Sequence, residues 1–142
     1  MLGILLKRVV FTNGCFDIIH RGHVEYLEDA KALGDILIIG LNSDSSIIGL
    51  KGADRPINKE EDRARVLLGL KSVDGVIMFE EDTPLNLIKI VKPDVLVKGG
   101  DWEIEQIAGH EFVLENGGEV LTIPFRSKHS TTDIIKKIRS LK

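Results

Sequence analysis

The chain has one cysteine, few aromatic residues (5% of 142) and no apolar run near the roughly 18 residues that a membrane-spanning helix requires. A single cysteine, Cys15, cannot form an internal disulfide, which is typical of a protein kept in a reducing compartment. The opening residues 1–6 carry no basic leader of the kind that begins a signal peptide. We therefore expect a cytoplasmic protein that does not associate with membranes.

An excess of charge of either sign is also missing. The 22 acidic and 19 basic side chains leave a formal net charge of -3. Because this balance gives no general attraction to nucleic acid, any anionic ligand must be held by a local cluster. A content of 43% hydrophobic and 29% charged residues is typical of a folded globular protein. The length predicts one domain, residues 1–142, with a full core.

Short apolar runs alternate with segments of helical period along the chain. We expect strands at residues 9–12, 36–41, 76–79, 95–97 and 120–123. We expect helices at residues 24–33, 58–70, 84–91, 107–115 and 132–141. Asn58, Thr83 and Ser130 are the expected N-caps of the second, third and fifth of these helices. Alternation of this kind predicts right-handed βαβ units. The expected fold is therefore α/β and Rossmann-like, a doubly wound parallel sheet of five strands with helices on both faces.

A glycine turn that carries two histidines follows the first expected strand. Residues 14–23 read Gly-Cys-Phe-Asp-Ile-Ile-His-Arg-Gly-His and lead into a helix. A strand that turns into a helix N-terminus directs backbone N–H groups and the positive end of the helix dipole at one place. His20 and His23 add side-chain donors there, charged or neutral. The context predicts a phosphate site, and we expect neither histidine to hold a metal, because Cys15 is too close to join them and no other cysteine exists.

Three further polar segments follow expected strands, and each has an ordinary alternative. Lys51 leads into a basic loop and could reach phosphates, but a lysine can also end a helix. Residues 98–101 form a glycine turn at the ligand edge of the sheet, where a tight turn alone would explain them. Residues 130–132 are either a plain helix cap or, with Arg126 and Lys128, a second phosphate-binding helix start.

These motifs together resemble the H-x-G-H nucleotidyltransferase superfamily, and within it the adenylyltransferase domain of ADP-heptose synthases. The resemblance covers nearly the whole chain. Its segments are residues 12–23, 42–44, 50–52, 55–56, 62–63, 81–84, 93–101 and 130–132. The sequence Val97-Lys98-Gly99-Gly100-Asp101 agrees with the heptose form, whereas cytidylyltransferases tend to carry M-G-D-D-W. Glycerol 3-phosphate cytidylyltransferases read R-T-E-G-I-S-T-T at the last site, and this chain has one residue fewer after Arg126.

The resemblance implies roles for the following residues. Catalysis is assigned to His20, His23 and Lys51; nucleotide binding to Thr12, Asn13, Gly14, Cys15, Phe16, Asp17, Arg63, Gly100, Asp101, Arg126, Ser130, Thr131 and Thr132; and acceptor binding to Lys51, Arg55 and Lys98. For the pair Asp62-Arg63, a surface ion pair of little value is the alternative.

The implied reaction is transfer of AMP from ATP to D-glycero-β-D-manno-heptose 1-phosphate, giving ADP-heptose for the lipopolysaccharide core. Mg²⁺ is expected with ATP, and Asp17 is the nearest carboxylate. We expect a homodimer and a separate kinase chain that supplies the sugar 1-phosphate, since the kinase domain of bifunctional members does not precede this one. The alternatives are a cytidylyltransferase for glycerol 3-phosphate, an adenylyltransferase for flavin mononucleotide, or a nucleotide-binding module without turnover.

Overall fold

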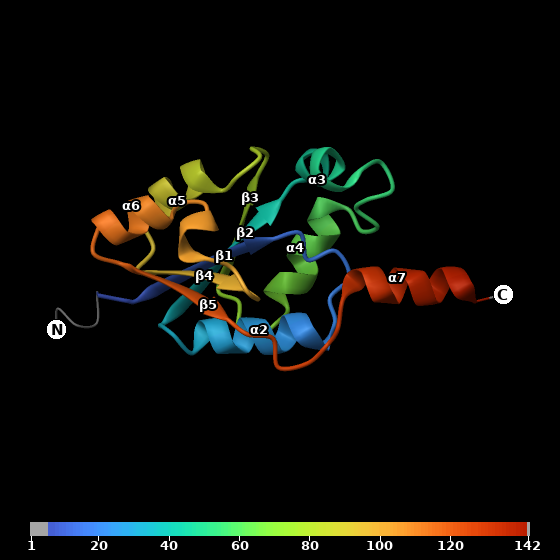
Figure 1. The fold of residues 1–142 in the computed structure, drawn as a ribbon, viewed down its shortest axis with the longest axis horizontal. Coiled ribbons are helices and arrows are strands. Elements are labelled where there is room, and N and C mark those ends of the chain that lie inside the picture. Colours follow the sequence, from blue (N-terminus) through green and yellow to red (C-terminus); the bar gives the residue numbers. More distant parts are fainter. Residues whose placement is uncertain (1–5, 142) are drawn as a thin grey trace.

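A computed structural model describes residues 6–141 of the chain (Figure 1). Its strands are β1 (Val9–Gly14), β2 (Ile36–Asn42), β3 (Gly75–Phe79), β4 (Val95–Gly99) and β5 (Glu119–Ile123). They form one sheet in the order β3-β2-β1-β4-β5, and every neighbouring pair is parallel. The strand order therefore reverses between β1 and β4, which is where parallel sheets of this kind bind ligands. The predicted Rossmann-like five-stranded sheet is confirmed.

Helices cover both faces of the sheet. They are α2 (Arg21–Lys31), α3 (Asp44–Lys51), α4 (Glu60–Leu68), α5 (Leu85–Val91), α6 (His110–Glu115) and α7 (Thr131–Ser140), with a 3-10 turn, η1 (Ile104–Gln106). One core cluster joins Leu27 of α2 and Leu67 of α4 to β1 and β2, and the other joins Ile88 of α5 and Val113 of α6 to Phe11 and β4. Each fully buried side chain of this size contributes about 1.5–3 kcal/mol. Packing of this kind fixes the carboxyl edge of the sheet as a rigid platform.

The last helix, α7, projects from the rest of the molecule (Figure 1). Ile135 is its one buried side chain among the residues described, and Ile138 is 58% exposed. Its first turn nevertheless lies against the body, because the Thr131 hydroxyl donates to the Ile18 carbonyl. Between residues 6 and 141 none of the helices has both the length and the apolar character needed to cross a membrane. The expectation of no basic leader concerns residues 1–5, which lie outside the described part.

Several element boundaries differ from the sequence prediction. Asn58 does not cap α4, which begins after Lys59 without a side-chain cap, because the Asn58 amide instead donates to the Asp17 carbonyl. The helix α3 was not expected, since only Ile47 of its apolar side chains is buried and its sequence shows little period. Pro84 stands one position before the first turn of α5. Gly109, with φ +89°, separates η1 from α6 and shortens the predicted helix 107–115.

Candidate active site

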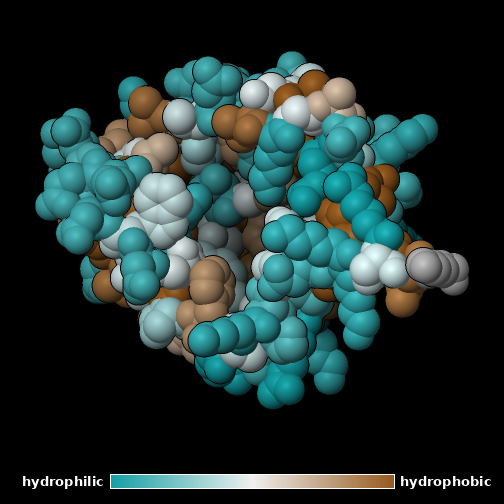
Figure 2. Space-filling model, turned by 45° about the vertical axis from the view of Figure 1, so that its right-hand side comes forward, coloured by the Kyte–Doolittle hydropathy of each residue, from teal (hydrophilic) through white to brown (hydrophobic). Residues whose placement is uncertain are grey.

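Two adjoining cavities lie where β1 and β4 end. The first, of about 230 Å³, is lined by the last residues of both strands, Asn13, Gly14, Lys98 and Gly99. The second, of about 310 Å³, continues from it toward the start of α7. Figure 2 brings the right-hand side of Figure 1 forward and shows a hollow near the middle of this face, with hydrophilic residues crowded beside it. The site predicted at the ligand edge of the sheet therefore has room for a small molecule.

Two helices begin at the second cavity and direct their N-termini toward it. His20 is the N-cap of α2, and its Nδ1 accepts from the Gly22 N–H at 3.1 Å. His23 reciprocates, because its Nδ1 accepts from the His20 N–H at 3.2 Å. At the other helix the Ser130 hydroxyl oxygen accepts from the Asp133 N–H at 3.0 Å. The free backbone N–H groups of both first turns favour an anion in the space between them.

These backbone contacts determine which nitrogen of each imidazole can donate. In a neutral ring whose Nδ1 accepts a hydrogen bond, the proton is on Nε2. The rings of His20 and His23 lie side by side, with centroids 3.9 Å apart and planes inclined by 31°. Both residues line the second cavity. The pair therefore supplies two neighbouring Nε2–H donors.

The pKa values of both imidazoles are lowered. Burial, and then the charges of His20 and Lys51, lower the pKa of His23 from 6.5 to about 4. Burial and then His129 lower the pKa of His20. Of the two uses the sequence left open, charged or neutral, the structure favours neutral donors at pH 7. Positive charge at the site comes instead from Lys51, which borders both cavities.

Lys51 is exposed and is the last residue of α3, with Gly52 after it, so of the two positions considered from the sequence the structure shows the helix end. Arg55 borders both cavities as well, and its Nη2 lies 3.5 Å from the Thr132 hydroxyl oxygen. Lys98 lies at the end of β4, with its Nζ 5.0 Å from the centroid of the Trp102 ring. Burial lowers the pKa of Lys98. The structure thus brings together the three cations expected to bind the acceptor, Lys51, Arg55 and Lys98.

The turn after β1 is built closely. Phe16 has a left-handed backbone, φ +46°, and its ring folds back over Gly14. A Cβ on Gly14 would lie 2.9 Å from that ring, so only glycine fits there without a shift. Residues 13–17 all border the first cavity. Thr12 is buried, and its hydroxyl is paired with the Tyr26 hydroxyl at 2.6 Å, so this side chain supports the site from behind.

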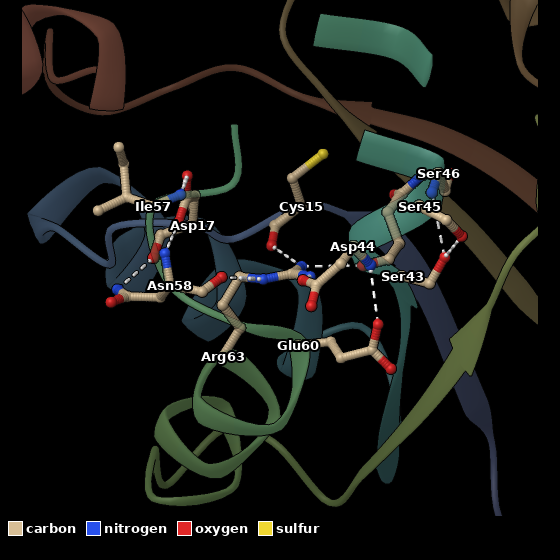
Figure 3. A network of polar contacts seen from close by, with 11 residues as sticks. Cys15, Asp17, Ser43, Asp44, Ser45, Ser46, Ile57, Asn58, Glu60 and Arg63 are labelled. Carbon is tan, nitrogen blue, oxygen red and sulfur yellow. Dashed lines mark hydrogen bonds and ion pairs between the residues drawn. The ribbon is translucent and has the colours of Figure 1, made fainter. Parts of the chain in front are cut away.

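Arg63 is not brought to the cavity, contrary to the expectation that it contacts nucleotide. Its side chain is fully buried and donates to the carbonyls of Cys15, Asn42 and Asn58 at 2.8–2.9 Å. It also forms an ion pair with Asp44 at 2.8 Å. Figure 3 shows the guanidinium at the centre of this network. Arg63 therefore stabilises the turn after β1 that lines the site. Because its side chain is buried, the alternative of a surface ion pair is also wrong.

Asp17 is buried and has two backbone partners. Its carboxylate oxygens accept from the N–H groups of Ile57 and Asn58, each at 2.8 Å (Figure 3). These contacts tie the motif to the segment before α4 and leave Asp17 poorly placed as a magnesium ligand. Over residues 6–141 no group of three His, Cys, Asp or Glu side chains is arranged to hold a metal ion. The described residues therefore do not form a protein cage for Mg²⁺.

Arg126 also turns away from the cavity. Its guanidinium donates to the Glu25 carbonyl and pairs with Glu28 and Asp29 on the outside of α2. The expected nucleotide contact of Arg126 is thus not present in this arrangement. Gly100 and Asp101 form the turn after β4, where Gly100 has φ +91°. Neither residue borders either cavity, whereas Gly99 borders the first.

Three residues at the site were not predicted from the sequence: Tyr26, Phe125 and His129. Phe125 is 60% exposed, borders both cavities and packs on the turn, since a Cβ on Gly99 would lie 2.9 Å from its ring. The position of an aromatic residue just beyond a strand end is the sequence signal that could have identified Phe125.

A larger hollow of about 530 Å³ lies between α5 and α6, but none of the motif residues borders it.

Comparison with known proteins identifies the family. The model for cytidylyltransferase-like proteins matches residues 11–137. The chain belongs to this family. It is 57% identical over 134 residues to the bifunctional protein HldE of a Nitratiruptor species, covering 94% of this chain and 28% of that protein. The chain thus spans little more than a quarter of that relative, and the resemblance drawn from the motifs is confirmed.

Solved structures agree with this assignment. A lipopolysaccharide core biosynthesis protein from Thermoplasma volcanium is 30% identical, with a TM-score of 0.68 over 88% of this chain and 100% of that one. Pantothenate synthetase from Thermus thermophilus has a TM-score of 0.63 at 15% identity, over 89% of this chain and 61% of that one. The second likeness shows the shared fold alone.

Proposed function

We propose that the chain transfers AMP from ATP to D-glycero-β-D-manno-heptose 1-phosphate, forming ADP-heptose and pyrophosphate. One observation carries the chemistry: two helix N-termini and two neutral Nε2–H donors converge on a cavity that Lys51 also borders. The motifs after β1 and β4 and the likeness to HldE proteins support the heptose acceptor. The likeness to the Thermoplasma protein of lipopolysaccharide core biosynthesis supports it too.

The transfer would be a single displacement. A phosphate oxygen of the sugar 1-phosphate attacks the α-phosphorus of ATP, a new P–O bond forms, and the bond to the bridging oxygen of the leaving pyrophosphate breaks. An anionic phosphate is already a nucleophile, so no general base is required. Catalysis then depends on positioning and on stabilising charge in the transition state.

Five residues that line the second cavity have a part in this scheme. His20 and His23 donate through Nε2–H to the α-phosphate, and Lys51 neutralises charge between the two reactants. The leaving pyrophosphate is held by the first turn of α7, through its N–H groups and the hydroxyl of Ser130, which keeps its proton while its oxygen accepts from Asp133. The Thr131 hydroxyl is already used on the Ile18 carbonyl, so Thr131 acts through its backbone.

Magnesium enters this proposal with the nucleotide and not as a resident ion. Because the described residues form no metal cage and Asp17 is engaged by two N–H groups, we assign no step to the metal. The acceptor is itself a phosphorylated sugar, so a kinase reaction must supply it. We also expect a homodimer, the commonest form of soluble homo-oligomer.

Pyrophosphate release tests the proposal. ATP and CTP are each mixed with heptose 1-phosphate, glycerol 3-phosphate or flavin mononucleotide, with acceptor-free mixtures as controls. We expect ATP with heptose 1-phosphate to react fastest, because a base site built for one donor and acceptor pattern leaves groups unpaired with the wrong base. Faster reaction of CTP with glycerol 3-phosphate would contradict the heptose assignment. Absence of reaction in all mixtures, with ATP bound, would favour a module without turnover.

A further inference from the structure

His129 lies close to the histidine pair at the second cavity. It precedes Ser130, the N-cap of α7, and its ring centroid is 6.1 Å from that of His20. It borders the second cavity together with His20 and His23. No role was predicted for it from the sequence, although it lies between Arg126 and Ser130 in the last motif. The site therefore contains three imidazoles, of which the first two come from the start of α2 and the third from the segment before α7.

Gly22 allows this approach. A Cβ at Gly22 would lie 3.0 Å from the His20 ring and 3.5 Å from the Cβ of His129. A side chain there would press on His20 and fill the space toward His129. The glycine between the two histidines of the motif thus lets the start of α2 and the segment before α7 come close together, with imidazoles on both sides.

The order of the residues along the two cavities indicates which phosphates His129 can reach. The first cavity is bordered by His23 but by neither His20 nor His129, whereas the second is bordered by all three. His129 is thus on the side away from the first cavity and next to the first turn of α7. In an in-line displacement the leaving group departs on the side opposite the nucleophile. Within the proposed function, the leaving pyrophosphate lies on the side of α7.

We propose that His129 donates a hydrogen bond to the β- or γ-phosphate of ATP and to pyrophosphate as it leaves. The inference rests on the proposed function and adds a residue to it. An imidazole donates at least one hydrogen bond whether it is neutral or protonated, so the contact exists in both states. A donor on the leaving group stabilises the negative charge that develops there as the bond to the α-phosphate breaks.

The test uses inorganic pyrophosphate as the probe and the variants His129→Gln and Lys128→Gln. Lys128 was a possible phosphate-binding cation in the sequence, but in the structure it is exposed and borders neither cavity. This neighbouring cation on the same segment is therefore the matched control. Calorimetry measures pyrophosphate binding, and steady-state kinetics gives KM for ATP and for heptose 1-phosphate. For His129→Gln we expect pyrophosphate binding to weaken about tenfold and KM for ATP to rise similarly, since a hydrogen bond to a charged group is lost. KM for the acceptor should change less than about twofold, as should every constant of Lys128→Gln.

Two results would overturn the inference. One is pyrophosphate binding by His129→Gln equal to that of the unaltered protein. The other is an equal loss in Lys128→Gln, which would show that the segment acts through its overall charge. Failure of the unaltered protein to bind ATP and pyrophosphate would instead contradict the proposed function itself.

Discussion

At the scale of single residues, the chemistry follows from the hydrogen bonds that the Nδ1 atoms of His20 and His23 accept. Each accepts a backbone N–H at the start of α2, so each ring presents Nε2–H to the cavity. A protonated ring could not accept through Nδ1, and protonation would break both caps. Neutral donors and a separate cation, Lys51, therefore divide the tasks of hydrogen bonding and charge neutralisation.

The lowered pKa of His23 makes stability depend on pH. Its value in the folded protein, about 4, is below the ordinary 6.5, so between these values the unfolded chain binds more protons. The free energy of unfolding should therefore decrease as the pH falls from about 6.5 to about 4. Urea unfolding at several pH values should show a shallower decrease in His23→Gln than in the unaltered protein. Identical pH profiles would contradict the lowered pKa, as would an NMR titration midpoint of His23 near 6.5 in the ligand-free protein.

Lys51 tests the role of the cation. Lys51→Met should reduce kcat by about tenfold or more, because it removes the charge between two phosphates. It should leave the melting temperature nearly unchanged, since Lys51 is exposed. Lys71→Met is the control, because Lys71 is exposed and borders neither cavity. A large fall in melting temperature with normal activity per folded molecule would show that Lys51 only completes α3.

At the scale of elements, Arg63 joins three parts of the fold. From α4 it reaches the Cys15 carbonyl in the turn after β1, the Asn42 carbonyl at the end of β2, and Asp44 at the start of α3. The turn needs such support, because Phe16 holds a left-handed backbone that is unfavourable for a bulky residue. The network therefore stabilises the turn that lines the first cavity.

We expect Arg63→Lys to lower the free energy of unfolding by about 2–3 kcal/mol, because one ammonium cannot satisfy three carbonyls and a carboxylate in these directions. ATP binding should weaken as well, since the turn loses its brace. Urea unfolding and calorimetry measure both effects. Arg65→Lys, an exposed site on the same helix, is the control and should change neither. Unaltered stability in Arg63→Lys would show that the network is dispensable.

The sequence was informative about elements whose signal is local. The continuous apolar run of β2 and the glycine turn after β1 were both predicted within two residues, because their patterns do not depend on distant partners. The failures involve partners far along the chain. Asn58 does not cap α4, because its side-chain amide donates to the Asp17 carbonyl. The helix α3 has a side-chain cap at Ser43 but little apolar periodicity in its sequence.

At the scale of the whole molecule, the parallel sheet gathers segments from residues 13 to 132 at one edge, and this could be predicted from strand order rules. The direction of long side chains could not. Arg63 and Arg126 both stand in motifs at this edge, yet buried carbonyls capture one and the acidic side chains of α2 capture the other. The direction of these side chains depends on which hydrogen-bond and ion-pair partners lie nearby in the fold. A sequence motif does not show those partners.

The central claim is that the histidine pair at the start of α2 carries nucleotidyl transfer. The most direct measurement follows ADP-heptose and pyrophosphate formed from ATP and heptose 1-phosphate by the unaltered protein, His20→Ala and His23→Ala. We predict equal amounts of both products from the unaltered protein. Each variant should turn over at least about 10²-fold more slowly, while its circular dichroism and ATP binding are retained. Near-normal turnover by both folded variants would contradict the account.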